Sequence, residues 1–315
     1  MKDTQKTPPG SAEYSSADPF YIVGPTGSGK SAIAIALAER CCGEIINADA
    51  YQLYEGLDIV TAKPSPSDFA RVPHHLFGTI PVSENLDAAT FERLGREAIA
   101  DVASRKSLPL VVGGSGLYVK TLTHGLSPLP SSEPGLRSEL DQKSDDELVA
   151  QLRTLDPEGA EMTNLKNRRY VIRALEICLL GGRPMSEQKS EWAAAAPVYR
   201  GVLIQRDRAE LYERINARTE EMFAEGLVAE IGGLGALSET AEKAIGVREV
   251  RAHIAGEIDL ATCIANIQQA TRRYAKRQMN WFRREPGFTS ICITARDDAD
   301  SAVHRILGTF PDLAH

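Results

Sequence analysis

The chain has 315 residues, 43% of them hydrophobic and 25% charged, a composition typical of a globular protein that buries a sizeable core. Its net charge of −7 speaks against a generally basic nucleic-acid binder, so any surface for RNA has to be a local patch. No apolar run approaches the roughly 20 residues that span a bilayer, and the five cysteines show no metal-ligand spacing with the six histidines. We therefore expect a cytoplasmic location and no contact with a membrane.

The first predicted elements are a tail, a strand, a glycine loop and a helix. Residues 1–17 are polar and lack the apolar run of a secretory signal, which predicts a disordered tail. The short apolar run FYIV, residues 20–23, predicts a strand. Residues 24–31, GPTGSGKS, match the phosphate-loop pattern G-x-x-x-x-G-K-[ST] and lead into good helix formers without a breaker. These elements follow one another in the order that phosphate binding requires.

The predicted phosphate loop offers three kinds of group to an anion. Its backbone N–H groups and the positive end of the following helix face the phosphate. Lys30 adds a positive charge, and Ser31 offers a hydroxyl ligand to Mg2+, the cofactor that we expect. The phosphate-binding residues expected here are Gly24, Pro25, Thr26, Gly27, Ser28, Gly29, Lys30 and Ser31.

A carboxylate follows in the second strand candidate. Residues 43–54, GEIINADAYQLY, are predicted to hold the second strand of a β-α-β unit, and they include Asp49. Because open α/β sheets bind ligands at the carboxyl ends of their strands, Asp49 is expected beside the phosphate loop. A later strand candidate, residues 108–119, ends in glycines and Ser115 without the acid that phosphate-loop hydrolases use to help hold Mg2+. This difference argues against an ordinary kinase or ATPase.

Breaks in composition predict the domain organisation. Stretches rich in Pro, Ser, Gly and Ala at 127–134 and 181–199 set off residues 126–198, which contain helical apolar spacing. Residues 202–207 are predicted to return to the core as a strand, and residues 209–282 are predicted to be largely helical. The predicted fold class is α/β: a P-loop NTPase-like core with a parallel sheet plus a helical insertion domain. The core comprises 18–125 and 199–285, the insertion 126–198, and 286–315 form a C-terminal segment.

Two basic clusters stand out in this acidic chain. On a helix, one side of TRRYAKRQMNWFRR would carry Arg272, Arg273, Lys276, Arg277, Arg283 and Arg284. The opposite, packed side would carry Tyr274, Ala275, Met279, Trp281 and Phe282. Six bases without an acid favour contact with RNA or diphosphate. A second cluster, Lys166, Arg168, Arg169 and Arg173, opens the helix predicted at 169–180.

Several separated motifs, in this order, resemble those of the tRNA dimethylallyltransferase family, and the resemblance covers about residues 20–285. After GPTGSGKS they are NADAYQLYEGLDIVTAKPS (47–65), PHHLFG (73–78), VVGGSGLYVK (111–120) and RYVIRALEI (169–177). The later ones are DRAELYERINARTEEMFAEGLVAEI (207–231), AIGVRE (244–249) and TRRYAKRQMNWFRRE (271–285). Where Ser, Thr and Tyr are common in the family, this chain has Ala50, Ser115 and Val247, and Tyr170 stands where Arg is frequent.

The resemblance implies transfer of a dimethylallyl group from dimethylallyl diphosphate to the exocyclic amine of the adenosine 3′-adjacent to the anticodon. It implies Asp49, Ser115 and Lys30 as catalytic residues, and Arg272 as a further diphosphate ligand. It implies tRNA contacts by Asp49, Ala50, Tyr51, Gln52, Ser115, Arg137, Arg169, Tyr170, Val171, Ile172, Arg173, Arg248, Arg273, Lys276 and Arg277. The expected partners are the anticodon stem-loop of tRNA and dimethylallyl diphosphate, and we expect a monomer.

Three alternatives remain open at this point. An adenylate isopentenyltransferase, which makes a cytokinin from AMP or ADP, would share the phosphate loop and the Asp but tends to lack the insertion. A P-loop small-molecule kinase or ATPase would turn over ATP without a prenyl donor. A non-catalytic RNA-binding module would have no use for a phosphate loop beside a carboxylate.

Overall fold

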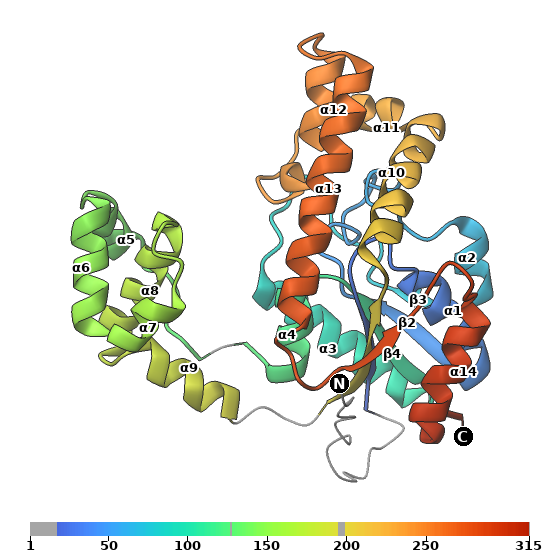
Figure 1. Ribbon diagram of the computed structural model, residues 1–315, viewed down its shortest axis with the longest axis horizontal. Coiled ribbons are helices and arrows are strands. Elements are labelled where there is room, and N and C mark those ends of the chain that lie inside the picture. The colour runs from blue at the N-terminus through green and yellow to red at the C-terminus, as the bar shows by residue number, and fades with distance from the viewer. Residues whose placement is uncertain (1–17, 127, 195–198, 315) are drawn as a thin grey trace. The chain divides into compact units, whose positions relative to one another are not determined.

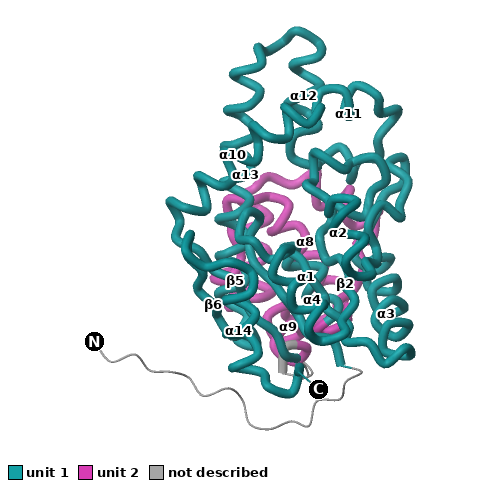
Figure 2. Tube along the Cα trace, turned by 90° about the vertical axis from the view of Figure 1, so that its right-hand side faces the viewer, with its two compact units in different colours: residues 1–122, 198–315 teal, residues 123–197 magenta. Residues whose placement is uncertain are grey.

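The computed structural model describes residues 18–126, 128–194 and 199–314, so the tail predicted at 1–17 lies outside the described residues. The chain divides into two compact units, drawn in different colours in Figure 2. Residues 1–122 and 198–315 form the core unit, and residues 123–197 form the insertion unit. The first boundary falls inside helix α4 (Gly116–His124).

The core unit is built on a six-stranded parallel sheet with the strand order β3-β2-β4-β1-β5-β6. The strands are β1 (Phe20–Val23), β2 (Gly43–Asn47), β3 (His74–His75), β4 (Leu108–Gly113), β5 (Arg200–Gln205) and β6 (Thr289–Cys292). Ile22 in β1 pairs with Val112 in β4 and with Val202 in β5, so β1 lies at the centre of the sheet. The loops that leave β1 and β4 are consequently neighbours.

Helices cover both faces of this sheet. The core unit contains α1 (Lys30–Cys41), α2 (Pro66–Arg71), α3 (Ala88–Ser104), α4, α10 (Arg208–Ala224), α11 (Leu227–Gly233), α12 (Val247–Ile254), α13 (Leu260–Phe282) and α14 (Ala299–Thr309). Short 3₁₀ helices lie at Ala241–Lys243 and Pro311–Ala314. Successive β1 side chains point to opposite faces: Phe20 and Ile22 join one apolar cluster, and Tyr21 and Val23 join another. Burial on both faces explains why FYIV is apolar throughout.

The insertion unit is helical and has its own apolar core. It contains α5 (Pro134–Asp141), α6 (Asp145–Leu155), α7 (Pro157–Met162), α8 (Arg168–Gly181) and α9 (Met185–Ala194). Leu148 and Leu152 of α6 pack with Val171 and Leu175 of α8 in this core. Ser144 caps α6 with a capping box, because its side chain accepts from the N–H of Glu147 while Glu147 accepts from Ser144.

The predicted fold class is confirmed, and two predicted strands are shorter than expected. β2 stops at Asn47, because Asp49 begins a turn, and β4 stops at Gly113, after which residues 116–119 start α4. The segment after residue 285, set apart in the sequence prediction, belongs to the core unit. There β6 pairs with β5, and Phe310 packs edge-on against Phe20 with ring centroids 5.1 Å apart.

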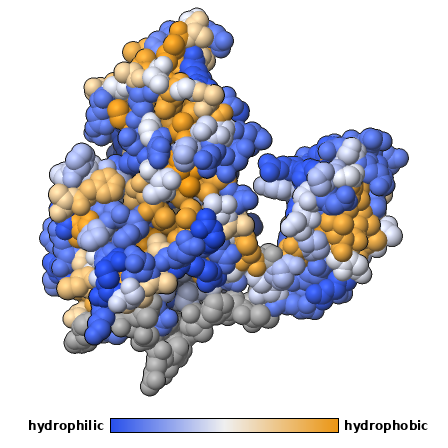
Figure 3. All heavy atoms as spheres, turned by 180° about the vertical axis from the view of Figure 1, so that it is seen from behind, coloured by the Kyte–Doolittle hydropathy of each residue, from blue (hydrophilic) through white to orange (hydrophobic). Residues whose placement is uncertain are grey.

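Helices α10, α11, α12 and α13 extend beyond the carboxyl ends of the strands (Figure 1). The opposite view shows polar side chains over most of the surface, with apolar ones in a band along the middle of the core unit (Figure 3). Within the described residues, no helix is both long and apolar enough to cross a membrane.

Candidate active site at the carboxyl edge of the sheet

The phosphate loop connects β1 to α1 with an open helix N-terminus. Gly27 and Gly29 have φ angles of +81° and +92°, and a Cβ on Gly27 would lie 3.1 Å from Cγ1 of Ile215. Gly29 is the N-cap of α1, and no side chain caps the helix. The first N–H groups of α1 are therefore free of a side-chain cap, as an anion site requires.

Three arginines hold this loop: Arg206, which directly follows β5, and Arg214 and Arg218 of α10. Arg206 Nε donates to the carbonyl of Ser28 at 2.9 Å, and Arg214 Nε donates to that of Gly27 at 2.9 Å. Arg218 Nη2 donates to the hydroxyl of Thr26 at 2.6 Å. The sequence prediction missed all three, although Arg214 and Arg218 are four residues apart and so share one helix face.

Asp49 lies next to this cationic loop. Its Oδ1 accepts from the N–H of Tyr51 at 3.1 Å, and its own N–H donates to Asn47 Oδ1 at 2.8 Å. Burial lowers the pKa of Lys30 to about 8, while the Asp49 charge opposes that shift. Burial also lowers the pKa of Arg218, and Asp49 again opposes the shift. One carboxylate thus stabilises two buried cations.

The glycine loop after β4 contacts the chain just before Asp49. The N–H of Ser115 donates to the carbonyl of Ala48 at 3.3 Å. A Cβ on Gly113 would lie 2.1 Å from that carbonyl oxygen, so only glycine permits the approach. The structure therefore brings Lys30, Asp49 and Ser115 to one edge of the sheet.

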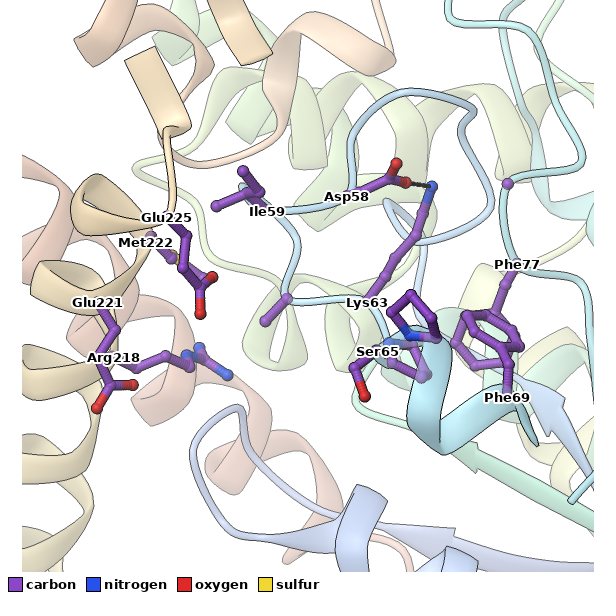
Figure 4. A pocket seen from close by; sticks show the side chains of 14 residues that line it. Asp58, Ile59, Lys63, Ser65, Phe69, Phe77, Arg218, Glu221, Met222 and Glu225 are labelled. Atoms are coloured by element: carbon purple, nitrogen blue, oxygen red, sulfur yellow. Dashed lines mark hydrogen bonds and ion pairs between the residues drawn. The ribbon is translucent and has the colours of Figure 1, made fainter. Parts of the chain in front are cut away.

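Three cavities surround Asp49, Arg218 or both. The outer cavity has a volume of about 620 Å3 and is lined by residues 58–59, 62–66, 69, 77–78, 218, 221–222 and 225. Figure 4 shows the Arg218 guanidinium projecting from α10 into it, with Phe69 and Phe77 on the opposite side. The phosphate-side cavity includes Lys30, Ser31, Asp49 and Gln52 in its lining.

The third cavity, called the apolar cavity, is lined by both polar and apolar residues. Its polar and hydroxyl-bearing lining residues are Thr26, Asp49, Tyr51, Thr61, Arg218, Thr219, Thr271 and Tyr274. The remaining lining residues are Val60, Met222, Leu227, Ala244, Ile245 and Ile267. Burial, followed by the Asp49 charge, raises the pKa of Tyr274, so this phenol stays protonated at neutral pH. A ligand with an anionic head and a short apolar tail fits such a lining.

The loop at residues 58–63 contributes to the walls of the outer cavity and the apolar cavity. The Glu230 carboxylate of α11 accepts from three successive backbone N–H groups, those of Asp58, Ile59 and Val60, at 2.7 to 3.0 Å. Gln52 Nε2 donates to the carbonyls of Thr61 and Ala62 at 2.9 and 3.0 Å. Gln52 was predicted to contact tRNA, and its side-chain N–H groups are engaged in these hydrogen bonds within the protein.

Helix α13 carries part of the predicted cationic face. Arg273, Lys276 and Arg277 are exposed, whereas Arg272 is half-buried and donates to Asn216 Oδ1 of α10 at 2.6 Å. Arg272 does not line the three cavities. Arg218 lines the outer and apolar cavities, Lys63 also lines the outer one, and Lys30 lines the phosphate-side cavity. The helix ends at Phe282, so Arg283 and Arg284 lie beyond the stripe predicted for them.

The remaining predicted tRNA contacts differ in exposure. Val171 and Ile172, also predicted to contact tRNA, are 1% and 2% exposed in the insertion core, so their side chains pack within the protein. Tyr170 is 56% exposed, and Arg169 is exposed beside it. Five others differ in their surroundings. Ala50 and Tyr51 are half-buried against the core, Arg137 and Arg173 are half-buried near Glu176 at 3.9 and 3.6 Å, and Arg248 is exposed near Glu242 at 3.5 Å.

Comparisons with known proteins agree on one family. The family model for IPP transferases matches residues 52–285. The tRNA dimethylallyltransferase of Akkermansia muciniphila is 43% identical over 288 residues, which are 91% of this chain and 98% of that relative. The enzyme of the same name from Geobacter sulfurreducens is 42% identical over 294 residues, 90% of this chain and 94% of that relative.

Two solved structures have the same overall fold. The tRNA isopentenylpyrophosphate transferase of Bacillus halodurans has a TM-score of 0.68 at 32% identity, covering 95% of this chain and 98% of its own. A eukaryotic dimethylallyltransferase described as acting on tRNA has a TM-score of 0.78 at 27% identity, covering 94% of this chain and 79% of its own.

Proposed function

Since this chain belongs to the IPP transferase family of tRNA dimethylallyltransferases, we propose that it prenylates the adenosine 3′-adjacent to the anticodon of tRNA. The donor is dimethylallyl diphosphate, and the product is N6-(dimethylallyl)adenosine. One observation carries the proposal: Asp49 lines both the phosphate-side cavity and the apolar cavity, where a diphosphate and a short prenyl chain would meet.

We expect the donor to extend across the two cavities that share Asp49. Its diphosphate would lie on the phosphate loop, whose amides, Lys30 and Arg218 supply positive charge. Its five-carbon chain would extend toward Val60, Leu227 and the other apolar residues of the cavity wall. An ATP molecule would place a polar ribose and base where this lining is apolar, which favours the prenyl donor.

The reaction joins N6 of adenosine to C1 of the dimethylallyl group. The nitrogen lone pair forms the new C–N bond, and the electron pair of the C1–O bond leaves with the diphosphate. Asp49 accepts a proton from the amine, and Lys30 and Arg218 stabilise the charge that develops on the departing oxygen. Ser115, held beside Ala48, would position the base from the glycine-loop side.

The residues fit Mg2+ bound together with substrate. No cluster of three or more His, Cys, Asp or Glu side chains that could hold a metal occurs among the described residues. Ser31 is exposed at the start of α1 and shares the phosphate-side cavity with Asp49, so its hydroxyl and substrate phosphate oxygens would hold the ion. When bound, Mg2+ supplies positive charge to the leaving diphosphate.

The tRNA would be held by local positive patches of an otherwise acidic protein. The cationic face, defined as Arg273, Lys276 and Arg277 of α13, is exposed, and Arg277 lies over the ring of Tyr274, which lines the apolar cavity. Arg169 and Tyr170 of the insertion unit are a second exposed pair. A tRNA substrate also supports the expected cytoplasmic location, and we propose that one chain suffices for activity.

Incubation with labelled dimethylallyl diphosphate, Mg2+ and an anticodon stem-loop tests the proposal. We expect label in N6-(dimethylallyl)adenosine and at most a trace when AMP replaces the RNA. Faster prenylation of AMP would indicate an adenylate isopentenyltransferase. ATP turnover without a prenyl donor would indicate a kinase or ATPase.

The kcat/KM for dimethylallyl diphosphate should fall as the pH rises through about 8. The Lys30 ammonium that attracts the diphosphate is present below its lowered pKa and lost above it. A bound diphosphate favours the charged form, so the effect belongs to the free enzyme and shows in kcat/KM. Steady-state rates between about pH 6.5 and 9.5 measure it. The variant Lys30→Arg stays charged and should flatten the profile, and an unchanged decline in that variant would contradict the assignment to Lys30.

Neutralising the cationic face should weaken tRNA binding and reduce its salt dependence. In the triple variant Arg273→Gln, Lys276→Gln and Arg277→Gln, the slope of log affinity against log salt should fall by about 2 to 3. Filter binding across a salt series measures the slope. A matched control with the same change in charge replaces three ion-paired arginines, Arg40, Arg71 and Arg305, by Gln. Equal losses in both variants would show that only net charge matters.

A further inference from the structure

Gln278 connects the two loops of the proposed active site. Its side chain is 4% exposed on the packed face of α13. Its Oε1 accepts from the N–H of Thr26 in the phosphate loop at 2.9 Å, and its Nε2 donates to the carbonyl of Gly114 in the glycine loop at 2.9 Å. One amide therefore joins a loop that follows β1 to a loop that follows β4.

The surroundings leave little freedom in this connection. A Cβ on Gly114 would lie 2.2 Å from Nε2 of Gln278, so the amide lies directly against the glycine loop. Thr26 is held a second time by Arg218, which lines the outer and apolar cavities. Tyr274 is four residues before Gln278 on α13 and lines the apolar cavity. An amide can accept and donate at once without carrying charge, which suits a position beside an anionic ligand.

We propose that Gln278 is a positioning residue for prenyl transfer. It fixes the distance between the phosphate loop, which would hold the diphosphate, and the glycine loop, whose Ser115 would hold the nucleobase beside Asp49. The inference rests on the proposed function. The inference adds a second role for helix α13. Its exposed side would bind RNA, and the buried amide of Gln278 would set the distance between the two reactants.

The isosteric variant Gln278→Glu tests the hydrogen bond to Gly114 while keeping the one from Thr26. A carboxylate still accepts from Thr26 but faces the Gly114 carbonyl without a proton to donate. Burial and that carbonyl raise the pKa of the new carboxyl, and its protonated form can donate to Gly114 again. Tyr274 hydrogen-bonds to Gln278, Arg218 holds Thr26 together with it, and Lys30 and Asp49 lie in the same site; all four ionisable residues are kept in the variant. The ratio of variant to wild-type kcat/KM at each pH removes only the pH dependence that the two enzymes share.

We expect that ratio to be about one tenth or less at pH 8 and to rise at least about threefold by pH 6. The loss should appear in kcat, with tRNA affinity within about twofold of the wild type. The exposed Gln269→Glu on the same helix makes the same chemical change and should stay within about twofold at both pH values. Activity of the wild type in the same assay tests the proposed function independently.

Two results would overturn the inference while the wild type remains active. One is a Gln278→Glu enzyme within about twofold of the wild type at pH 8. The other is a loss that does not change with pH, because a purely structural defect would not be repaired by a proton. If Gln278→Glu fails to fold, Gln278→Met replaces it, because methionine fills a similar volume without either hydrogen bond. A kcat of Gln278→Met close to that of the wild type would then overturn the inference. Failure of both variants to fold would make the role structural and overturn the inference.

Discussion

The variant Asp49→Asn is expected to lower the rate constant of prenyl transfer by about 10²- to 10⁴-fold, the usual contribution of a positioned general base. The amide keeps the size of the side chain and can still accept from the N–H of Tyr51. The amide cannot take a proton from the attacking amine. The substitution also removes the negative charge beside Lys30 and Arg218. Single-turnover measurements with saturating tRNA and donor isolate this step.

Binding measurements separate the chemical role of Asp49 from its structural one. Diphosphate affinity should be nearly unchanged in Asp49→Asn, because two buried cations lose a competing partner while the pKa of Lys30 falls further without the Asp49 charge. The control Asp298→Asn alters a carboxylate that also accepts a backbone N–H, that of Ser301, but that caps α14 and lines none of the three cavities. A single-turnover rate of Asp49→Asn within about threefold of the wild type would refute the assignment of Asp49 as base.

Arg218→Gln should reduce kcat/KM for dimethylallyl diphosphate by about 30- to 100-fold, corresponding to about 2 to 3 kcal/mol for a lost charge-assisted contact to phosphate. The guanidinium projects into the outer cavity (Figure 4). It also donates to the hydroxyl of Thr26 in the phosphate loop. Because Arg218 would hold the departing diphosphate, both the KM for the donor and kcat should change. Steady-state kinetics with the donor varied at saturating tRNA measure both constants.

The neighbouring arginine provides a matched control. Arg214 lies one turn earlier on α10 and donates to the carbonyl of Gly27, but it lines none of the three cavities. Arg214→Gln should therefore change kcat/KM for the donor by less than about threefold. Similar losses in the two variants would mean that both arginines only support the loop, and that Arg218 does not contact the donor.

Local patterns predicted the parts of the fold and site that depend on neighbouring residues in the chain. The predicted family and α/β fold class are confirmed. The strand, glycine loop and helix at residues 20–41 could be predicted because neighbouring residues specify each of them. The position of Asp49 at the ligand-binding edge followed from strand order alone. The roles assigned to Asp49, Ser115 and Lys30 stay predictions.

Contacts between distant segments could not be read from local patterns. Arg218 reaches Thr26 across 192 positions, and Gln278 reaches it across 252, so no window of sequence contains either pair. A polar residue on the packed side of a predicted helix was nevertheless a usable signal, and Gln278 lies there with Ala275 and Phe282. Helical spacing would likewise have placed Val171 and Ile172 on the buried side of α8.

The bonds that hold Thr26 have a consequence for how the enzyme becomes active during synthesis. The glycine motif leaves the ribosome early, but β5, Arg218 and Gln278 follow only after the insertion unit has been made. A chain that ends before residue 278 would contain the complete phosphate-loop motif but would lack the Gln278 bond that helps to hold Thr26. Nonsense mutations that end the chain shortly before residue 278 should therefore abolish activity as completely as early ones.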